Sequence, residues 1–233
     1  MIGGASSRVW DSRTPVVTLV FLALVLAVAL SLSAPAWAAS DASIAGTVTD
    51  SHGAPLWGVG VAVSGGTGGF AFTDPDGRYM VEGLAAGSYQ VDFYLYRYVW
   101  QFWDGVTWPK RGDDIVLAEG EQRAGIDAAL VLGAEIRGRV TDDEGVPVWA
   151  SIAAYHPGNY RVVYFCMAEA DGTYSLAGLP AGTYYVSFEA QGFTPEWFDG
   201  MTTRAKATRL HLTEGDVVTG LDATLAPLTA GGI

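Results

Sequence analysis

Residues 76–91 read Asp-Gly-Arg-Tyr-Met-Val-Glu-Gly-Leu-Ala-Ala-Gly-Ser-Tyr-Gln-Val, and residues 171–186 read Asp-Gly-Thr-Tyr-Ser-Leu-Ala-Gly-Leu-Pro-Ala-Gly-Thr-Tyr-Tyr-Val. The match extends outward on both sides, so that residues 44–130 and 136–225 are two copies of one sequence. The copies are offset by 92 residues at their start and by 95 residues from position 76 onward. Repeat units of solenoid proteins are only about 20–50 residues long. We therefore predict that each copy is a complete domain.

Each copy is predicted to form seven short strands separated by glycine- and aspartate-rich turns. In the first copy the strands are predicted at residues 43–49, 58–63, 69–73, 78–82, 89–96, 114–118 and 125–132. Within the fifth strand, apolar and polar residues alternate with a period of two, which predicts one buried and one outward face. The predicted inward residues are Tyr89, Val91, Phe93 and Leu95 in the first copy and Tyr184, Val186 and Phe188 in the second. The predicted outward residues are Gln90, Asp92, Tyr94 and Tyr96 in the first copy and Tyr185, Ser187 and Glu189 in the second.

No stretch after the N-terminal segment has a helical period, and many short strands with regular turns are typical of a sandwich. The predicted fold class is therefore all-β, with two tandem seven-stranded antiparallel β-sandwiches after an N-terminal signal peptide. The predicted core of the first copy comprises Val48, Val61, Tyr79, Leu84, Tyr89, Val91 and Phe93.

Residues 1–38 have the pattern of a signal peptide. Arg8 and Arg13 precede an apolar stretch at residues 16–32, and Ala36 and Ala38 supply a cleavage site for signal peptidase. An uncleaved membrane anchor through residues 16–32 is the alternative, because that stretch just reaches spanning length. Both interpretations place the remaining chain outside the cytoplasm, as a secreted or extracytoplasmic protein. The predicted domains are residues 39–132 and 133–228.

Composition restricts the class of partner. The formal net charge is −12 for the whole chain and −13 without its first 38 residues. A strongly acidic protein repels phosphate backbones, so we expect no nucleic acid partner. Hydrophobic residues make up 50% and charged residues 16% of the chain, which excludes a disordered protein.

The two copies share the motifs G-x-V-T-D-x-x-G-x-P and D-G-x-Y-x-x-x-G-L-x-x-G-x-Y-x-V. On these motifs, residues 44–132 and 136–226 resemble the carboxypeptidase regulatory-like domain, which is similar to prealbumin-like and carbohydrate-binding-like sandwiches. The resemblance implies a secreted or surface accessory module. Related adhesin sandwiches often carry a Lys–Asn crosslink, but Lys110 and Lys206 lie outside the predicted first strands, so we expect no such bond.

The sequence contains no recognisable catalytic, cofactor-binding or metal-binding motif. The three histidines have no metal-ligand spacing, and the carboxylates cluster in turns, where solvated side chains are usual. A calcium site at Asp74 and Asp76, or at residues 142–144, would lack the full series of ligands that a recognisable calcium-binding loop contains. Cys166 matches Ala71 of the first copy, which indicates a small buried residue. We therefore predict no enzyme, cofactor or metal.

The segment after the fifth strand differs most between the copies. Both keep an aromatic pair before Asp-Gly, Phe102-Trp103 and Trp197-Phe198, which we interpret as structural. Only the first copy adds Tyr94, Tyr96, Trp100 and Trp108, where the second has Glu189, Gln191, Pro195 and Thr203. Clustered exposed aromatics are typical of a binding surface. The four residues are the candidate binding face; burial against the second domain is the alternative.

The sequence thus favours a non-catalytic module for protein interaction or assembly at the cell exterior. A carbohydrate-binding module of the starch-binding type is the alternative, and a polysaccharide-degrading enzyme such as an amylase is a more distant one. The expected partner is an extracellular protein or carbohydrate, and a membrane only if the N-terminal segment is not cleaved.

Overall fold

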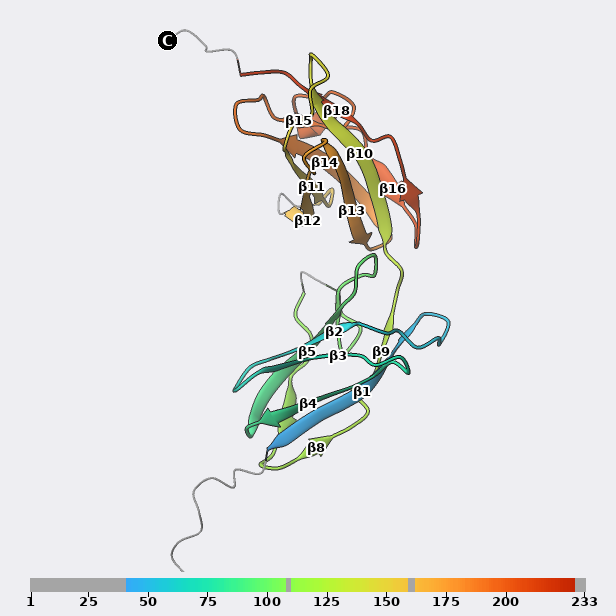
Figure 1. The fold of residues 1–233 in the computed structure, drawn as a ribbon, viewed down its shortest axis with the longest axis vertical. Helices are drawn as coiled ribbons and strands as arrows, with labels where there is room; N and C mark the ends of the chain where they lie inside the picture. Colours follow the sequence, from blue (N-terminus) through green and yellow to red (C-terminus); the bar gives the residue numbers. More distant parts are fainter. Residues whose placement is uncertain (1–40, 108–109, 159–161, 229–233) are drawn as a thin grey trace, which may run out of the picture. The chain divides into compact units, whose positions relative to one another are not determined.

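The computed structural model describes residues 41–107, 110–158 and 162–228. The predicted signal peptide therefore lies outside the described residues. Residues 40–233 belong to one unit, in which two β-sandwiches follow each other along the chain (Figure 1). Within the described ranges, no helix has the length and apolarity needed to cross a bilayer.

The first sandwich consists of two sheets, and its first strand is the longest. One sheet has the order β4-β1-β8, with β9 also pairing with β1, and the other has the order β3-β2-β5-β6, with β7 also pairing with β5. The strands are β1 (Ala42–Asp50), β2 (Gly60–Ser64), β3 (Gly69–Phe72), β4 (Arg78–Leu84), β5 (Gly87–Tyr94), β6 (Gln101–Phe102), β7 (Ile115–Leu117), β8 (Gln122–Arg123) and β9 (Ala128–Leu130).

The second sandwich repeats this topology. Its sheets have the orders β13-β10-β17, with β18 pairing with β10, and β12-β11-β14-β15, with β16 pairing with β14. Its elements are β10 (Ala134–Asp142), β11 (Ser151–Tyr155), β12 (Val162–Met167), β13 (Thr173–Leu179), β14 (Gly182–Glu189), β15 (Glu196–Trp197), the short 3-10 helix η1 (Arg204–Lys206), β16 (Leu210–Leu212), β17 (Val217–Val218) and β18 (Ala223–Leu225).

The tandem all-β sandwich fold is confirmed, with two differences in detail. Short strands β6 and β15 form in the segments after the long fifth strands, where no strand was predicted. The last predicted strand of the first copy, at residues 125–132, is shorter in the structure and forms β9, and β8 precedes it where no strand was predicted. Both β8 and β9 pair with the first strand in parallel, at Ser43↔Gln122 and Val48↔Ala128. Gly125, which has a φ of 78°, lies in the turn between β8 and β9.

The predicted core residues are all buried between the two sheets. The tyrosine of each Asp-Gly-x-Tyr motif packs edge-on against the central phenylalanine, with 5.9 Å between ring centroids for Tyr79–Phe93 and for Tyr174–Phe188. Their hydroxyls donate to the carbonyl oxygens of Ile126 (2.7 Å) and Leu221 (2.6 Å). The tyrosine of the motif is therefore a core residue in both sandwiches, and the polar end of each ring is hydrogen-bonded.

The Asp-x-Asp sequence at residues 74–76 forms a turn. Oδ1 of Asp74 accepts hydrogen bonds from the backbone N–H groups of Asp76 and Arg78. Gly77 closes the turn with a φ of 75°, where a side chain is disfavoured. Among the described residues, no three His, Cys, Asp or Glu side chains gather closely enough to hold a metal ion.

Three residues that were predicted to point outward are buried. Asp92, Tyr185 and Ser187 are at most 7% exposed. The adjacent residues on the same strands lie in the two cores as predicted: Val91 and Phe93 in the first copy, and Tyr184, Val186 and Phe188 in the second. The prediction of exposure was wrong because the segment after each fifth strand folds back across the outer face of the sheet. Trp100 covers Asp92 in this way, and its Nε1–H donates to Asp92 Oδ1 at 2.8 Å.

Candidate binding face

The outer face of sheet β3-β2-β5-β6 carries exposed aromatic rings on both sides of its central strand. Gly60 of β2 pairs with Phe72 of β3 on one side and with Tyr94 of β5 on the other. Phe70 of β3 lies one row further along, opposite Ala62. We call Phe70, Phe72, Tyr94 and Trp100 the aromatic face.

The small residues of β2 allow the rings to meet. A Cβ atom at Gly60 would lie 2.4 Å from the ring of Tyr94, so the tyrosine ring lies directly over the glycine. The ring is stacked beside Phe70, at 6.1 Å and an interplanar angle of 29°. Phe70 in turn contacts Phe72 edge-on at 4.8 Å. The result is a continuous aromatic surface.

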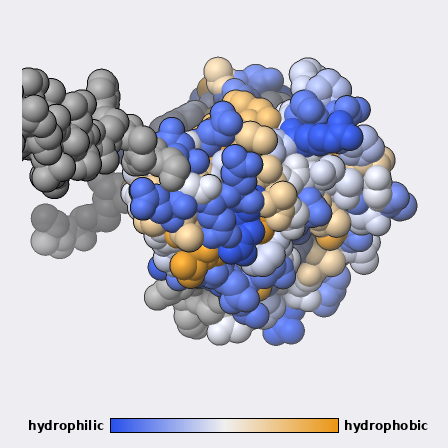
Figure 2. All heavy atoms as spheres, turned by 90° about the horizontal axis from the view of Figure 1, so that it is seen from below, coloured by the Kyte–Doolittle hydropathy of each residue, from blue (hydrophilic) through white to orange (hydrophobic). Residues whose placement is uncertain are grey.

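These rings are open to solvent. Phe72 is 64% exposed, Phe70 47%, Tyr94 44% and Trp100 39%. On the face of the molecule seen in Figure 2, hydrophilic residues predominate and hydrophobic residues lie in small separate groups. A cluster of neighbouring exposed rings is the kind of surface that marks an interaction site.

The structure separates the four residues that the sequence predicted as one site. Tyr94 and Trp100 belong to the aromatic face, but Tyr96 turns toward the second sandwich, and Trp108 lies outside the described residues. Phe70 and Phe72 were missed because each has an aromatic or apolar counterpart in the second copy, Phe165 and Met167. Comparing equivalent positions of the two copies pointed only to aromatic residues of the first copy that the second copy does not match with an apolar or aromatic residue of similar kind.

The second sandwich has a groove where the first has this face. A groove of about 350 Å³ is lined by Trp149, Ser151, Met167, Glu189 and Pro195, among others. Glu189 and Pro195 stand where Tyr94 and Trp100 stand in the first copy. In the first copy, the larger rings of Tyr94 and Trp100 thus stand where the second copy has a groove lined by polar and apolar side chains.

A cationic side chain also covers part of the outer face of the second sandwich. The guanidinium of Arg204 lies 5.0 Å from the ring centroid of Tyr185, 5.7 Å from that of Tyr155 and 6.0 Å from that of Trp197. Contacts of this length are cation–π interactions. They hold the segment around η1 on the sheet, so this part of the sheet is not free for a partner.

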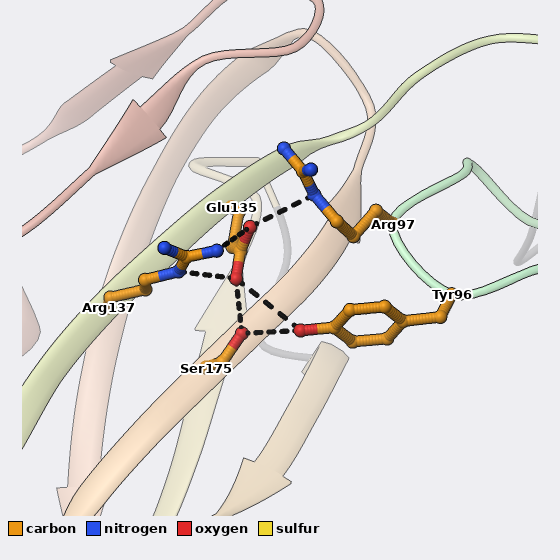
Figure 3. A network of polar contacts seen from close by, with 5 residues as sticks. All are labelled: Tyr96, Arg97, Glu135, Arg137 and Ser175. Carbon is orange, nitrogen blue, oxygen red and sulfur yellow. Dashed lines mark hydrogen bonds and ion pairs between the residues drawn. The ribbon is translucent and has the colours of Figure 1, made fainter.

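Tyr96 belongs to a polar network centred on Glu135, whose side chain is fully buried at the start of β10 (Figure 3). Arg137 donates to both carboxylate oxygens at 2.6 and 2.8 Å, and Arg97 forms an ion pair at 3.1 Å. Ser175 donates at 2.6 Å and is 3.0 Å from the hydroxyl of Tyr96. Residues 96 and 97 thus connect the first copy to the first strand of the second.

The network lowers the pKa of Glu135, chiefly through the hydrogen bonds from Arg137, with Ser175 and Arg97 adding to the effect. Burial acts in the opposite direction but is outweighed. At Asp92 the balance is reversed: burial raises the pKa of the carboxyl group, and the hydrogen bond from Trp100 offsets only part of the rise. Burial also raises the pKa of Cys166 to about 11, so its thiol stays protonated at neutral pH.

Replacing Glu135 with glutamine is expected to destabilise the second sandwich by about 1–2 kcal/mol at pH 7, because charge-assisted hydrogen bonds are lost. A carboxylate with a lowered pKa contributes stability above its unfolded pKa and loses it as the pH falls through the folded value. The difference between wild type and variant should therefore shrink below about pH 4. Urea denaturation between pH 7 and pH 3 measures it, and a difference that does not change with pH would contradict this role.

Comparison with known proteins agrees with the fold. The family model of the carboxypeptidase regulatory-like domain matches residues 43–101 and 135–225. No curated protein matches the chain significantly.

Several solved structures are similar to the chain. The TIE protein of Bacillus anthracis is 16% identical, with a TM-score of 0.33 over 81% of this chain and 34% of that one. The streptococcal ancillary pilin is 16% identical, with a TM-score of 0.37 over 82% of this chain and 63% of that one. The minor pilin GBS52 of Streptococcus agalactiae is 11% identical, with a TM-score of 0.36 over 82% and 98%. The chain thus spans about a third of the TIE protein and less than two thirds of the ancillary pilin.

The two regions matched by the family model include most of the strands described above and both Asp-Gly-x-Tyr motifs. The chain belongs to the carboxypeptidase regulatory-like domain family and contains two tandem copies of that domain.

Proposed function

We propose that this protein is an exported, non-catalytic module that docks onto a partner protein at the cell exterior through the aromatic face of its first domain. Export is inferred from the signal-peptide pattern of residues 1–38. The two domains are taken as residues 39–132 and 133–228. The second domain serves as a spacer or a support, because it has Glu189 and Pro195 in place of Tyr94 and Trp100.

The exposure of Phe70, Phe72 and Tyr94 as one continuous surface is the observation that carries the proposal. Aromatic residues dominate the energetics of protein interfaces, since they bury a large rigid area at little cost in side-chain entropy. Their exposure costs free energy in the unbound protein, and binding a partner recovers it.

Carbohydrate binding is the second candidate function. The rings of Phe70 and Tyr94 are inclined by only 29°, and flat apolar rings can stack on sugar faces. If the ligand is a carbohydrate, soluble cell-surface polysaccharide should compete with the cell envelope for binding to this protein. If the partner is a protein, protease treatment of the envelope should abolish binding instead.

We expect a Phe72→Ser, Tyr94→Ser double variant to bind the cell envelope of the producing organism at least tenfold more weakly than wild type, because truncating an interface aromatic often costs about 2 kcal/mol. Both residues are well exposed, so the melting temperature should change little. The matched control is Phe165→Ser, Met167→Ser in the second domain, which should bind normally. Unchanged binding of the first variant, or equal losses in both, would refute the proposed docking surface.

A further inference from the structure

Strand β3 is a free sheet edge. It is the last strand in the order β3-β2-β5-β6, and among the described residues it pairs with β2 alone. The N–H of Thr73 donates to the carbonyl of Val59 across this pair at 3.0 Å. Backbone groups alternate in direction along an antiparallel strand. The N–H and C=O groups of Phe70 and Phe72 therefore point away from β2, toward the open edge.

Apart from its short length of four residues, this edge lacks the features that usually protect one. Natural edge strands commonly carry lysine, proline, a bulge or an inward charge, which prevent pairing with another chain. β3 reads Gly-Phe-Ala-Phe, with no charge and no proline, and its register with β2 is regular over four pairs. Both phenylalanine rings are exposed. Main-chain groups and apolar side chains are thus available at the same place.

A groove of about 620 Å³ adjoins the end of the strand. Phe72 lines it together with Tyr79 and Met80 of β4, and Met80 is 56% exposed. A strand added beside β3 would direct alternate side chains to opposite faces. One set would contact the aromatic face, and side chains near Phe72 would reach this groove.

Charge indicates what kind of chain would bind. Asp74 and Asp127 also line the groove, and its one basic residue, Arg78, forms an ion pair with Asp76 at 2.8 Å. The formal net charge of the whole chain is −12. Two copies therefore repel each other, whereas a cationic segment is attracted.

We propose that β3 accepts an extended segment of the partner protein as an additional strand of its sheet. The segment has large apolar side chains at alternate positions and lysine or arginine next to Asp74 and Asp127. This inference rests on the proposed function, because the same partner contacts the aromatic face. Main-chain hydrogen bonds to Phe70 and Phe72 provide affinity, and the rings and carboxylates select the sequence.

The test separates the main-chain contribution from that of the ring at one position. Phe70→Ala removes the ring, whereas Phe70→Pro removes the ring and the outward N–H. Proline is tolerated at an edge strand when its missing N–H faces solvent, and Gly69 before it avoids the usual steric restriction. The probe is a synthetic peptide of alternating valine and threonine with two lysines at each end. A peptide with glutamates in place of the lysines is its charge control.

We expect the proline variant to bind the lysine peptide about tenfold more weakly than the alanine variant, because a main-chain hydrogen bond is lost. The glutamate peptide should bind wild type more weakly than the lysine peptide does. In NMR hydrogen exchange on wild type, the amides of Phe70 and Phe72 should become protected when the peptide binds, while Ala71, already paired with β2, should not change. Circular dichroism of both variants should match wild type.

Equal binding of the alanine and proline variants, or no binding of the lysine peptide at millimolar concentration, would overturn the inference. The proposed docking function would survive either result if the Phe72→Ser, Tyr94→Ser variant still lost envelope binding. The inference would also be overturned if the wild-type protein formed a dimer and the Phe70→Pro substitution abolished it. The strand added beside β3 would then come from a second copy of this protein.

Discussion

Replacing Tyr174 with alanine is expected to lower the free energy of unfolding of the second sandwich by about 3–5 kcal/mol, as is typical when a buried aromatic ring is deleted. The ring is only 4% exposed and packs on Phe188. Its hydroxyl donates to the carbonyl oxygen of Leu221. Leu221 lies just before β18, which pairs with β10. The substitution thus leaves both a cavity and an unpaired buried carbonyl. Urea denaturation, with the two domains followed separately, measures the loss.

Tyr174→Phe is the matched control, because it keeps the ring and removes only the hydrogen bond. It should cost about 1–2 kcal/mol. Tyr79→Ala in the first sandwich should repeat the larger effect there, since Tyr79 makes the same contacts with Phe93 and Ile126. Unchanged stability in both alanine variants would show that the motif tyrosines do not carry the core.

Gly138→Ala is expected to destabilise the second sandwich by about 3 kcal/mol, at the upper end of the usual cost of overpacking. A Cβ atom at this position would lie 2.2 Å from the carbonyl oxygen of Leu221 and 3.0 Å from the ring of Tyr174. The backbone atom cannot move without losing the hydrogen bond from Tyr174, so the strain and the lost bond add.

Gly158→Ala tests whether this cost comes from the contact, since a Cβ atom there would meet nothing within 4 Å. The change should alter stability by no more than about 0.5 kcal/mol. Thermal melting of the two glycine variants, side by side, gives the comparison. Similar melting temperatures for both would mean that β10 and the Leu221 segment can separate at little cost.

The shared motifs were sufficient to predict the fold because their residues have backbone and packing requirements that are local. Gly77 and Gly172 have positive φ angles, and Tyr79 and Tyr174 fill equivalent places in two cores. The seven predicted core residues are all buried. The strand boundaries and the parallel pairing of β8 and β9 with β1 were harder to predict from the sequence. Pairing between residues about 80 positions apart, such as Val48 and Ala128, has no local sequence signal.

The candidate site was predicted only in part. Differences between the copies pointed to Tyr94 and Trp100, which lie on the exposed sheet face. The same comparison joined Tyr96 to them, because period-two alternation continues from Tyr94. The chain leaves the strand after Tyr94, however, and the backbone of Arg97 takes a φ of 70°. Tyr96 therefore contacts Ser175 and Glu135.

The sequence by itself determined the duplication, the all-β class, the two cores and the surplus of aromatic residues in the first copy, because these follow from pattern and spacing. Only the tertiary structure decided which rings are exposed together, which carboxylates are buried and which strand edge is open. Those properties depend on the residues that face one another across strands and on how a connecting segment folds back over a sheet. Phe70 and Tyr94 are 24 positions apart in the chain and become neighbours only because β2 lies between their strands.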